Sequence, residues 1–593
     1  MILAQLPQSI ADTVTRALLF AVVCLAAALY ATGLDRVPIH LHHDEVYFGM
    51  ISHSLSQTWR DPNGRLLPIL FQMGDSHHWY PPILIYFTAL WLKLLPLSDA
   101  AVRLPNAVIG VANVVLIYFV AQRMFRDRWL ALAAAAILAA TPAHFINSRI
   151  ATDCLYPVAF ILAWLLLLLR YLETPTRLRL FAAMSVLGVG VYSYIASVVM
   201  MPIYALMTAA VLWRERRLAD SWPGVAGFAW PMLFGVGFLA VHPTIVADYM
   251  KKYQLADGTA SLNLFQQLRD TLTPWNISDH LNLFHSSFAP GYLFVTGGSN
   301  IAHSTRLAGV FLAPLAVLLI VGIVDVIRRP TTVKLLVLAG FVTAPLAATL
   351  VPEDFAVPRM LGLLPFGVLL SIGGLARLAA APLGFSPRLL TTVAGVAVAG
   401  IGAAYATLML IRQGHLSSSA VVMIAAGIAT WMLGVICDRR RSWQPVAIVL
   451  LLLMPAQFAV FAADYFGDYR ARSAARYGYN IRGAIEQAIA VHDRSPGVPF
   501  YFNDDTLFIR AYWDYYLRVF KRTELLAQAV WFNSEHGLPH LDPGTIVVTN
   551  VSDRVKPVLA SVPGLVVVGE ATDPVPGTNP PEDTVTFLIL QKR

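Results

Sequence analysis

The stretch PILIYFTALWLKLLPL, residues 82–97, decides how the chain crosses the membrane. By hydropathy alone it could be a transmembrane helix, because about 20 apolar residues in a helix span a hydrocarbon core of about 30 Å. The rest of the chain is equally apolar: 57% of its 593 residues are hydrophobic, 13% are charged, and the mean hydropathy is +0.62. A soluble chain carries about 25% charged residues. The composition therefore predicts a multi-pass membrane protein, and residues 82–97 set its orientation.

Long apolar runs recur from Thr13 to about Phe461 and predict thirteen transmembrane helices, without counting residues 82–97. These helices are expected near residues 13–33, 103–122, 129–147, 154–169, 180–195, 197–213, 225–242, 306–327, 335–351, 359–376, 389–411, 419–436 and 444–462. We interpret the first run as a retained helix, because no small-x-small cleavage site precedes a soluble domain.

The distribution of basic residues shows which interpretation of residues 82–97 is correct. If this segment does not cross, six basic clusters all lie in cytoplasmic loops, as the positive-inside rule requires. The clusters hold 17 of the 43 basic residues: Arg123/Arg126/Arg128, Arg170/Arg177/Arg179, Arg214/Arg216/Arg217, Arg328/Arg329/Lys334, Arg377/Arg388 and Arg439/Arg440/Arg441. If it did cross, all later clusters would lie outside. Residues 82–97 are therefore expected to form a juxtamembrane or re-entrant helix.

This topology places the N-terminus in the cytoplasm and the C-terminal segment outside. It also explains the net charge of +8 without nucleic-acid binding. The expected domains are a transmembrane domain, residues 1–463, with external loops 34–102 and 243–304, and an extracytoplasmic α/β domain, residues 464–593. The three cysteines of the chain all lie in or beside membrane segments, so no external disulfide or cysteine metal site is expected.

The C-terminal segment has the pattern of a small α/β domain. VPFYFND (498–504), GTIVVTN (544–550), LVVVGE and TVTFLILQ are short apolar runs that predict strands. TLFIRAYWDYYLRVF (506–520) has helical apolar spacing, and the proline-rich residues 573–583 are expected to form a surface loop. About 130 residues can bury their own core.

The outward ends of the predicted helices carry charged side chains from segments that are far apart in sequence. Charges at membrane depth cost about 2.5–3.5 kcal/mol each on insertion scales, so those retained need a reason. The set comprises Asp44, Glu45, Arg103, Arg149, Asp153, His242, His303, Arg306, Glu353, Asp354 and Arg359. Arginine can bind a phosphate through paired charge-assisted hydrogen bonds, and a carboxylate can take a proton from a hydroxyl. These residues indicate a site where a lipid phosphate is displaced from a sugar.

Several of these residues also have structural explanations. Arg149 and Asp153, at positions i and i+4, could form an ion pair within one helix. Arg103 could anchor its helix at the lipid headgroups, and Arg359 could lie at the interface for the same reason.

The first external loop, HLHHDEVYFG (40–49), concentrates the ionisable groups most strongly. Asp44 and Glu45 are not expected to lie on a solvated face, because the apolar residues that follow them fold the segment against the membrane. The histidines could be solvated loop residues. A divalent cation is an open alternative, with Asp44, Glu45, His43 and His78 as candidate ligands, although their spacing matches no zinc motif.

A series of motifs resembles the C-type membrane glycosyltransferases, in particular the bacterial relatives of protein O-mannosyltransferases and lipid A aminoarabinose transferases. The resemblance covers about residues 13–380. The motifs, in chain order, are HDEVYFGMISHSL (43–55), RDPNGRLLPILF (60–71), YPPILIYFTALWLKLL (80–95), AVRLPNAVIG (101–110), SRIATD (148–153), YSYIAS (192–197), YLFVTGGSNIAHSTRLAG (292–309) and VPRMLGLLP (357–365).

The resemblance implies an inverting transfer of a sugar from a polyprenyl phosphate to a hydroxyl at the periplasmic face of a bacterial inner membrane. It implies that Asp44 is catalytic, with Glu45 beside it, and that Arg359 and Arg149 contact the donor phosphate. We expect Arg103 to assist them, and Asp153, His303 and Tyr80 to support the site. A lipid, polysaccharide or protein would be the acceptor, and membrane lipids would surround the chain. No nucleotide-binding GxxxxGK[ST] stretch is present.

Two other functions remain open from the sequence. A transporter or flippase of a lipid-linked glycan would need ionisable groups along a path through the membrane, and the predicted helices have almost none at their centres. A non-catalytic scaffold would bind an envelope partner through its C-terminal domain.

Overall fold

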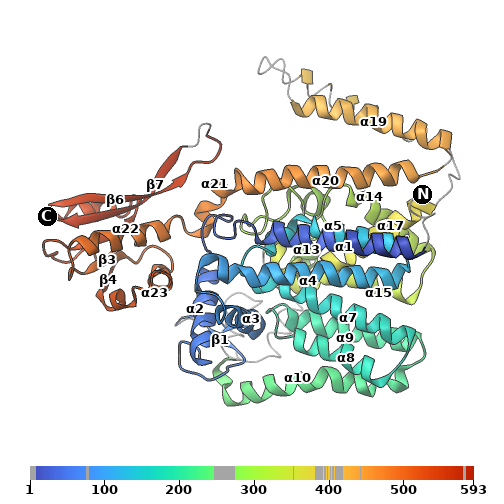
Figure 1. The fold of residues 1–593 in the computed structure, drawn as a ribbon, viewed down its shortest axis with the longest axis horizontal. Helices are drawn as coiled ribbons and strands as arrows, with labels where there is room; N and C mark the ends of the chain where they lie inside the picture. Colours follow the sequence, from blue (N-terminus) through green and yellow to red (C-terminus); the bar gives the residue numbers. More distant parts are fainter. Residues whose placement is uncertain are drawn as a thin grey trace.

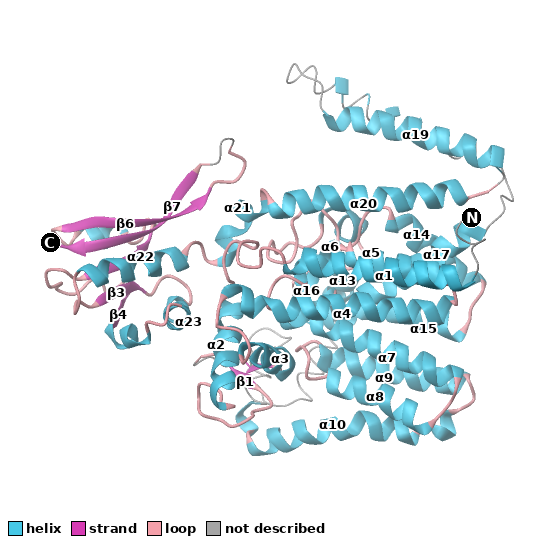
Figure 2. Ribbon diagram, viewed as in Figure 1, coloured by secondary structure: helices cyan, strands magenta, loops and turns pink. Residues whose placement is uncertain are grey.

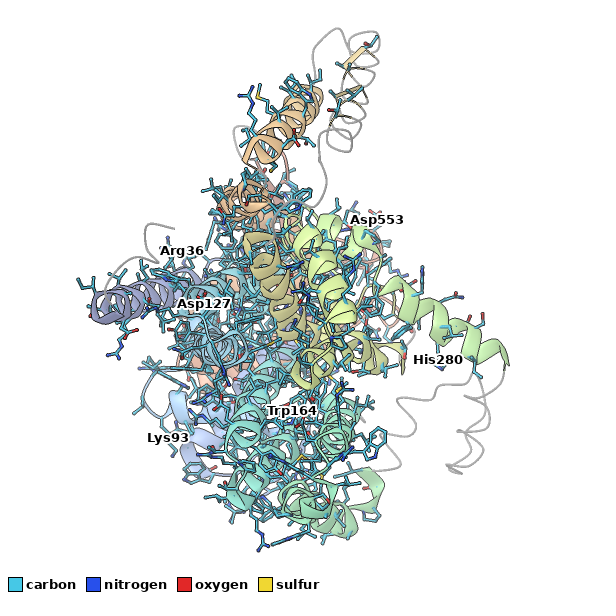
Figure 3. The ribbon with its side chains drawn as sticks, turned by 90° about the vertical axis from the view of Figure 1, so that its right-hand side faces the viewer. Arg36, Lys93, Asp127, Trp164, His280 and Asp553 are labelled. Atoms are coloured by element: carbon cyan, nitrogen blue, oxygen red, sulfur yellow. The ribbon has the colours of Figure 1, made fainter. Side chains whose placement is uncertain are left out.

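The computed structural model describes residues 8–74, 79–245, 274–350, 353–380, 418–440, 442–578 and 582–593, together with scattered positions within 392–407. Most of the helices lie roughly parallel in one bundle, and a β-sheet lies at one end of it (Figures 1 and 2). The first helix, α1 (Gln8–Ala31), begins at the other end of the bundle. Viewed along the bundle from the end opposite the sheet, Trp164, a fully buried side chain, lies among the helices (Figure 3).

Eight of the described helices are long and apolar enough to cross a membrane, fewer than the thirteen expected. These spans are Ile10–Ala31, Asp99–Phe125, Asp153–Glu173, Ser197–Arg214, Trp222–Val241, Thr332–Thr349, Leu363–Ala380 and Gln444–Phe466. They comprise α1, α4 (Asp99–Phe125), η2 (Asp153–Leu155) with α7 (Tyr156–Glu173), α9 (Ser197–Arg214), α10 (Trp222–Val241), α15 (Thr332–Thr343) with η5 (Ala344–Leu350), α17 (Leu363–Ala380) and α20 (Gln444–Phe466). The multi-pass membrane architecture is confirmed.

The remaining expected spans differ for local reasons. The span expected at 129–147 is two helices, α5 (Arg128–Ala139) and α6 (Pro142–Asn147), because Pro142 begins a new helix after Thr141. The spans expected at 180–195 and 306–327 are the shorter helices α8 (Arg177–Gly190) and α14 (Leu315–Arg328). Residues 418–440 form α19, and 389–411 lie outside the fully described ranges. Hydropathy detects apolar runs but not the chain breaks inside them.

The segment 82–97 forms a short helix, α3 (Pro82–Leu92). Eleven residues rise about 16 Å, roughly half of the hydrocarbon thickness. Pro81 and Pro82 begin the helix, and its buried face includes Leu84, Ile85 and Leu92. The expectation that this segment does not span the membrane agrees with its length.

The arginine-rich loops are linked to one another by contacts between helix ends. Arg123 in the last turn of α4 pairs with Glu173 at the end of α7. Glu215 after α9 accepts a hydrogen bond from Thr332, which begins α15. Asp325 of α14 lies 2.6 Å from the Lys334 ammonium and 3.9 Å from the Arg377 guanidinium. The arrangement matches the expectation that the basic loops share one side.

Short elements lie at the end of the bundle nearest the sheet. The helix α2 (His43–Thr58) lies across the direction of the bundle helices, beside α3 and a small hairpin of β1 (Phe71–Gln72) and β2 (Trp79–Tyr80) (Figure 1). Further along the chain come α13 (Pro274–Ser286), the π-helical turn η4 (Tyr292–Thr296) and α16 (Val357–Met360). Among the arginine-rich loops, a short 3₁₀ turn, η3 (Leu218–Asp220), connects α9 to α10.

The C-terminal segment folds around a five-stranded mixed sheet in the order β4-β3-β5-β7-β6. The strands are β3 (Phe500–Asn503), β4 (Ala529–Phe532), β5 (Ile546–Asn550), β6 (Leu565–Pro574) and β7 (Asp583–Lys592). The helices are α21 (Tyr469–Ser473), η6 (Ala474–Tyr477), α22 (Ile481–Arg494), α23 (Ile509–Val519), η7 (Thr523–Gln528) and α24 (Lys556–Ala560). β3 is parallel to β4 and β5, whereas β7 is antiparallel to β5 and β6. All four predicted strands are present, and β4 and α22 are additional.

The C-terminal α/β part contacts the first external loop through buried polar bonds. The His40 Nε2 lies 2.5 Å from the Asp573 Oδ1, and both side chains are largely buried. The Arg482 guanidinium lies 3.0 Å from the Asp99 carboxylate at the start of α4. Gly49 of α2 allows a close approach, because a Cβ atom there would lie 2.8 Å from the Tyr515 ring of α23. These contacts fix the start of α2 between the bundle and the sheet.

Candidate active site

Asp44 lies in the first turn of α2, where it faces a cavity. His42 caps the helix, since its Nδ1 accepts from the Asp44 backbone N–H and the Glu45 carboxylate accepts from the His42 N–H. The Asp44 Oδ1 accepts a 2.6 Å hydrogen bond from the Tyr80 hydroxyl. The rings of His42 and His43 lie 3.4 and 3.6 Å from its carboxylate oxygens. The carboxylate is one-third exposed, so a substrate can reach it.

The surroundings of Asp44 keep its carboxylate ionised. Burial raises the pKa of this group, but the adjacent imidazoles of His42 and His43 and the hydrogen bond from the Tyr80 hydroxyl together lower it below its usual range. Burial and the Asp44 charge raise the pKa of Tyr80, so the phenol stays a hydrogen-bond donor. Asp44 is therefore a permanent anion at neutral pH.

Glu45 also lines this cavity, but its side chain is fully buried and bonded to the protein. Its Oε1 and Oε2 each lie 2.8 Å from nitrogens of Arg103, in a bidentate pair. Its two oxygens also accept from the backbone N–H groups of Ala151 and His42, at 2.8 and 2.9 Å. The prediction that Glu45 takes part in catalysis is not supported, because its oxygens are occupied by protein donors. Its occupied oxygens also make it unsuitable as a metal ligand.

Arg103 uses all five of its N–H groups on protein acceptors. Two bind Glu45, and the other three bind the carbonyl oxygens of Leu34, Pro38 and His40 at 2.5–2.8 Å. A phosphate would have to displace one of these bonds. Arg103 therefore holds the first external loop against α4. This position supports neither the expected contact with the donor phosphate nor the alternative of an anchor at the lipid headgroups.

Arg149 is also fully buried and forms hydrogen bonds with the end of α1. Its terminal nitrogens donate to carbonyl oxygens of the last turn of α1 and the residues after it, and its guanidinium lies 4.7 Å from the centre of the Phe466 ring. Residues 148–152 are not helical, so Arg149 and Asp153 do not share a helix. The expected phosphate contact of Arg149 and the alternative intrahelical pair are both unsupported by this geometry.

A cavity of about 280 Å³ brings together most of the other predicted residues. Its charged and polar lining includes Asp44, Tyr80, Asp153, His303, Glu353, Arg359 and Arg476. They come from α2, β2, η2, the loop before α14, α16 with the residues before it, and η6. The structure thus gathers side chains from six separate segments at the end of the bundle near the sheet.

Arg359 and His303, from the middle part of the chain, line this cavity together with Asp44. The Arg359 guanidinium is mostly buried and lies 2.7 Å from the Glu353 carboxylate. The His303 Nδ1 lies 2.8 Å from the Asn147 Oδ1, while the Asn147 amide nitrogen donates to the Ala143 carbonyl. This orientation of Asn147 makes Nδ1 the protonated nitrogen of His303 and leaves Nε2 as an acceptor. Burial, with the charges of His42 and Arg476, lowers the pKa of His303 to about 3.

His42, His43 and Asp44 could each offer one ligand atom to a metal ion, and these atoms lie within 4.8 Å of one another. Three donors are the usual protein contribution to an open zinc site. His78, the fourth predicted candidate, lies outside the described residues.

Two lining residues come from the C-terminal segment and were not predicted. Arg476 and Tyr477 enter the cavity wall from η6. Residues beyond 464 match no motif. No regular spacing of apolar residues distinguishes Arg476 from its neighbours in the linker that α21 and η6 form (residues 469–477). Only the folded contact of this linker with residues 300–305 places them at the site.

Part of the chain matches a known protein family. Residues 80–239 match the family model described as dolichyl-phosphate-mannose-protein mannosyltransferase, PMT_2. The matched part contains Tyr80 and Asp153 of the cavity. A search of the curated proteins found no match.

Two solved structures are similar over almost the whole chain. Both are crystal structures of ArnT from Cupriavidus metallidurans, one bound to undecaprenyl phosphate and one in the apo state. The first has a TM-score of 0.56 at 14% identity and covers 98% of each chain. The second has a TM-score of 0.52 at 14% identity and covers 96% of this chain and 97% of the other. The resemblance predicted from the motifs is confirmed: residues 80–239 match a glycosyltransferase family model, and the chain has the fold of ArnT.

Proposed function

We propose that this protein is an inverting glycosyltransferase that moves a sugar from a polyprenyl phosphate to an acceptor hydroxyl at the extracytoplasmic face of a bacterial inner membrane. The observation that carries the proposal is the cavity that both Asp44 and Arg359 line. An ionised acid and an arginine in one cavity suit a hydroxyl that attacks and a phosphate that leaves.

An apolar pocket next to this cavity fits the lipid part of the donor. It has a volume of about 360 Å³ and is lined by Leu67, Pro68, Ile69, Pro82, Ile83, Tyr86, Val189, Tyr192, Trp230, Pro231 and Phe234. Residues 79–81 and 194–195 line the polar cavity, whereas residues 82–86 and 189–192 line the apolar pocket. Because the same two segments pass from one to the other, a ligand with an anionic head and an isoprenoid tail can occupy both.

The proposed reaction is a displacement at the anomeric carbon. The acceptor oxygen forms a bond to that carbon, the bond to the phosphate oxygen breaks, and its electron pair goes to the phosphate. The hydroxyl proton goes to Asp44. The low pKa of Asp44 makes it a weak Brønsted base, so it also contributes as a fixed negative charge beside a carbon that becomes more positive.

His303 and Tyr80 fit supporting roles in this scheme. The neutral Nε2 of His303 can accept a hydrogen bond from a sugar or acceptor hydroxyl, because no charged form is populated near pH 7. Tyr80 holds the Asp44 carboxylate in one orientation through its 2.6 Å bond. Arg359 contacts the donor phosphate, and Asp153 faces the same substrate space.

The domain division and orientation follow from the same scheme. Residues 1–463 form the transmembrane catalytic domain, with loops 34–102 and 243–304 outside. Residues 464–593 form the extracytoplasmic α/β domain, and the N-terminus lies in the cytoplasm. A lipid, polysaccharide or protein is the acceptor.

Mass spectrometry of envelope glycans and glycolipids from cells with and without the gene tests this proposal. We expect one sugar substituent to be missing in the deletion strain and to return with the wild-type gene. Purified protein should transfer that sugar from its polyprenyl phosphate. Intact envelope glycans, together with donor movement across vesicles in the absence of transfer, would refute the proposal and favour a flippase. Activity after chelation shows whether a cation at His42, His43 and Asp44 is needed.

A further inference from the structure

Two arginines line the polar cavity, and their bonding differs. Arg359 is paired with Glu353 at 2.7 Å, so its charge is largely balanced by the protein. Arg476 is exposed, and among the described residues no carboxylate is paired with it. Its position in the cavity wall therefore supplies positive charge that the surrounding protein does not neutralise.

The linker that carries Arg476 is held firmly on the loop before α14. The Tyr469 hydroxyl donates to the Ile301 carbonyl at 2.8 Å, and the Tyr477 hydroxyl donates to the Ala302 carbonyl at 3.1 Å. Tyr477 is fully buried against Ile150 and Ala302. The residues on both sides of Arg476 are thus fixed, and its backbone cannot move away from the cavity without breaking these contacts.

The side chain of Arg476 is also oriented. Its Nε donates a 3.1 Å hydrogen bond to the Asn300 Oδ1, which also accepts from the Ala302 N–H at 3.0 Å. This bond uses one edge of the guanidinium plane. The two terminal nitrogens remain for a ligand, and together they match the spacing of two phosphate oxygens.

Two of the carboxylates that line the cavity are balanced by arginines. Glu45 is balanced by Arg103, and Glu353 is balanced by Arg359. Asp44 and Asp153 also line the cavity, and among the described residues no arginine is paired with Asp44. His303 is neutral, because burial and the nearby charges of His42 and Arg476 lower its pKa to about 3. The charge of Arg476 already acts at His303, which places the two side chains within electrostatic range of one another.

We propose that Arg476, contributed by the C-terminal segment, binds the donor phosphate and stabilises it as it leaves. This inference rests on the proposed function. The donor is a phosphodiester with one negative charge. When the bond between the anomeric carbon and oxygen breaks, its electron pair goes to the phosphate, and the product is a polyprenyl phosphate monoester that carries up to two negative charges. Arg476 therefore binds the product more strongly than the donor.

The experiment uses the full-length protein in detergent with undecaprenyl phosphate as the probe. Dissociation constants and transfer kinetics are measured for wild type, Arg476→Gln and Arg476→Lys. The matched control is Arg470→Gln, because Arg470 lies on α21 of the same linker but donates to the Arg36 carbonyl at 3.2 Å and does not line the cavity. Thermal unfolding shows that each variant is folded.

We expect Arg476→Gln to weaken undecaprenyl phosphate binding and to lower kcat, each by about tenfold or more, since bonds to charged groups have that weight. KM for the donor should change less than kcat, Arg476→Lys should be intermediate, and Arg470→Gln should match wild type. Wild-type binding and kcat in a folded Arg476→Gln would overturn this inference and leave the proposed function standing. A wild-type protein that neither binds the probe nor transfers sugar would overturn both.

Discussion

The buried pair of Glu45 and Arg103 gives a sharp test of which acid has which role. We predict that Glu45→Ala destabilises the protein by about 3–5 kcal/mol, because it leaves the Arg103 charge buried without a partner. The structure supports the upper part of this range. The Glu45 side chain is 0% exposed and that of Arg103 is 1% exposed, and the backbone N–H groups of His42 and Ala151 lose their acceptor as well.

Such a loss corresponds to a change of roughly 10²–10⁴-fold in the ratio of folded to unfolded protein. The assay is equilibrium unfolding of the purified protein in mixed micelles, followed by tryptophan fluorescence. The control is Asp35→Ala, because Asp35 is 55% exposed, pairs with Arg36 at 3.9 Å and should contribute about 0–1 kcal/mol.

A double-mutant cycle separates the pair from its surroundings. Arg103→Met should also destabilise strongly, and Glu45→Ala with Arg103→Met should cost less than the two single changes added together. It should not restore full stability, because three carbonyl oxygens lose their donor. If Glu45→Ala unfolded like the wild type but no longer transferred sugar, the structural role of Glu45 would be refuted and a catalytic role favoured.

Three further results are expected. Asp573→Ala removes the acceptor of His40 and of the Asn480 N–H, so the unfolding midpoint should fall, and an unchanged midpoint would show that the contact between sheet and loop is weak. The pKa of His303 is lowered to about 3 from about 6.5, so the unfolded chain binds more protons between these values and the protein loses stability as the pH falls from about 6.5. His303→Gln should show a shallower loss of melting temperature between pH 7 and 5, and an equal slope would contradict the assignment. Ile83→Trp should fill part of the apolar pocket and raise KM for a long polyprenyl donor more than for a short-chain donor, whereas equal effects on the two donors would exclude the pocket as the tail site.

The general architecture was predictable because composition and charge asymmetry are properties of the sequence itself. The noncrossing of residues 82–97 followed from the basic loops, and α3 has the short length that this requires. The four predicted strands of the C-terminal sheet are present for a similar reason, since alternation and turn residues mark them locally. The number of spans was not predictable from hydropathy, because a break such as the one at Pro142 lies within a continuous apolar run.

The site was only partly predictable, because its organisation depends on tertiary pairs. Asp44 and Glu45 are neighbours in sequence and both line the cavity, but only the Glu45 carboxylate is paired with Arg103. The sequence offered no way to distinguish an arginine that binds phosphate from one that binds protein carbonyls. Arg149 and Arg103 are of the second kind in this structure, whereas Arg359 lines the cavity. Arg476 was missed because only the packing of the linker on residues 300–305 brings it there.

The kinetics of Asp44→Asn test the central claim most directly. Wild type and variant are purified in the same detergent and compared in transfer from the polyprenyl-phosphate sugar, undecaprenyl phosphate binding and thermal unfolding. We predict that kcat falls by about 10²–10⁴-fold, the usual range for loss of a general base, while unfolding and probe binding change little. A folded Asp44→Asn that transfers sugar at the wild-type rate would contradict the account.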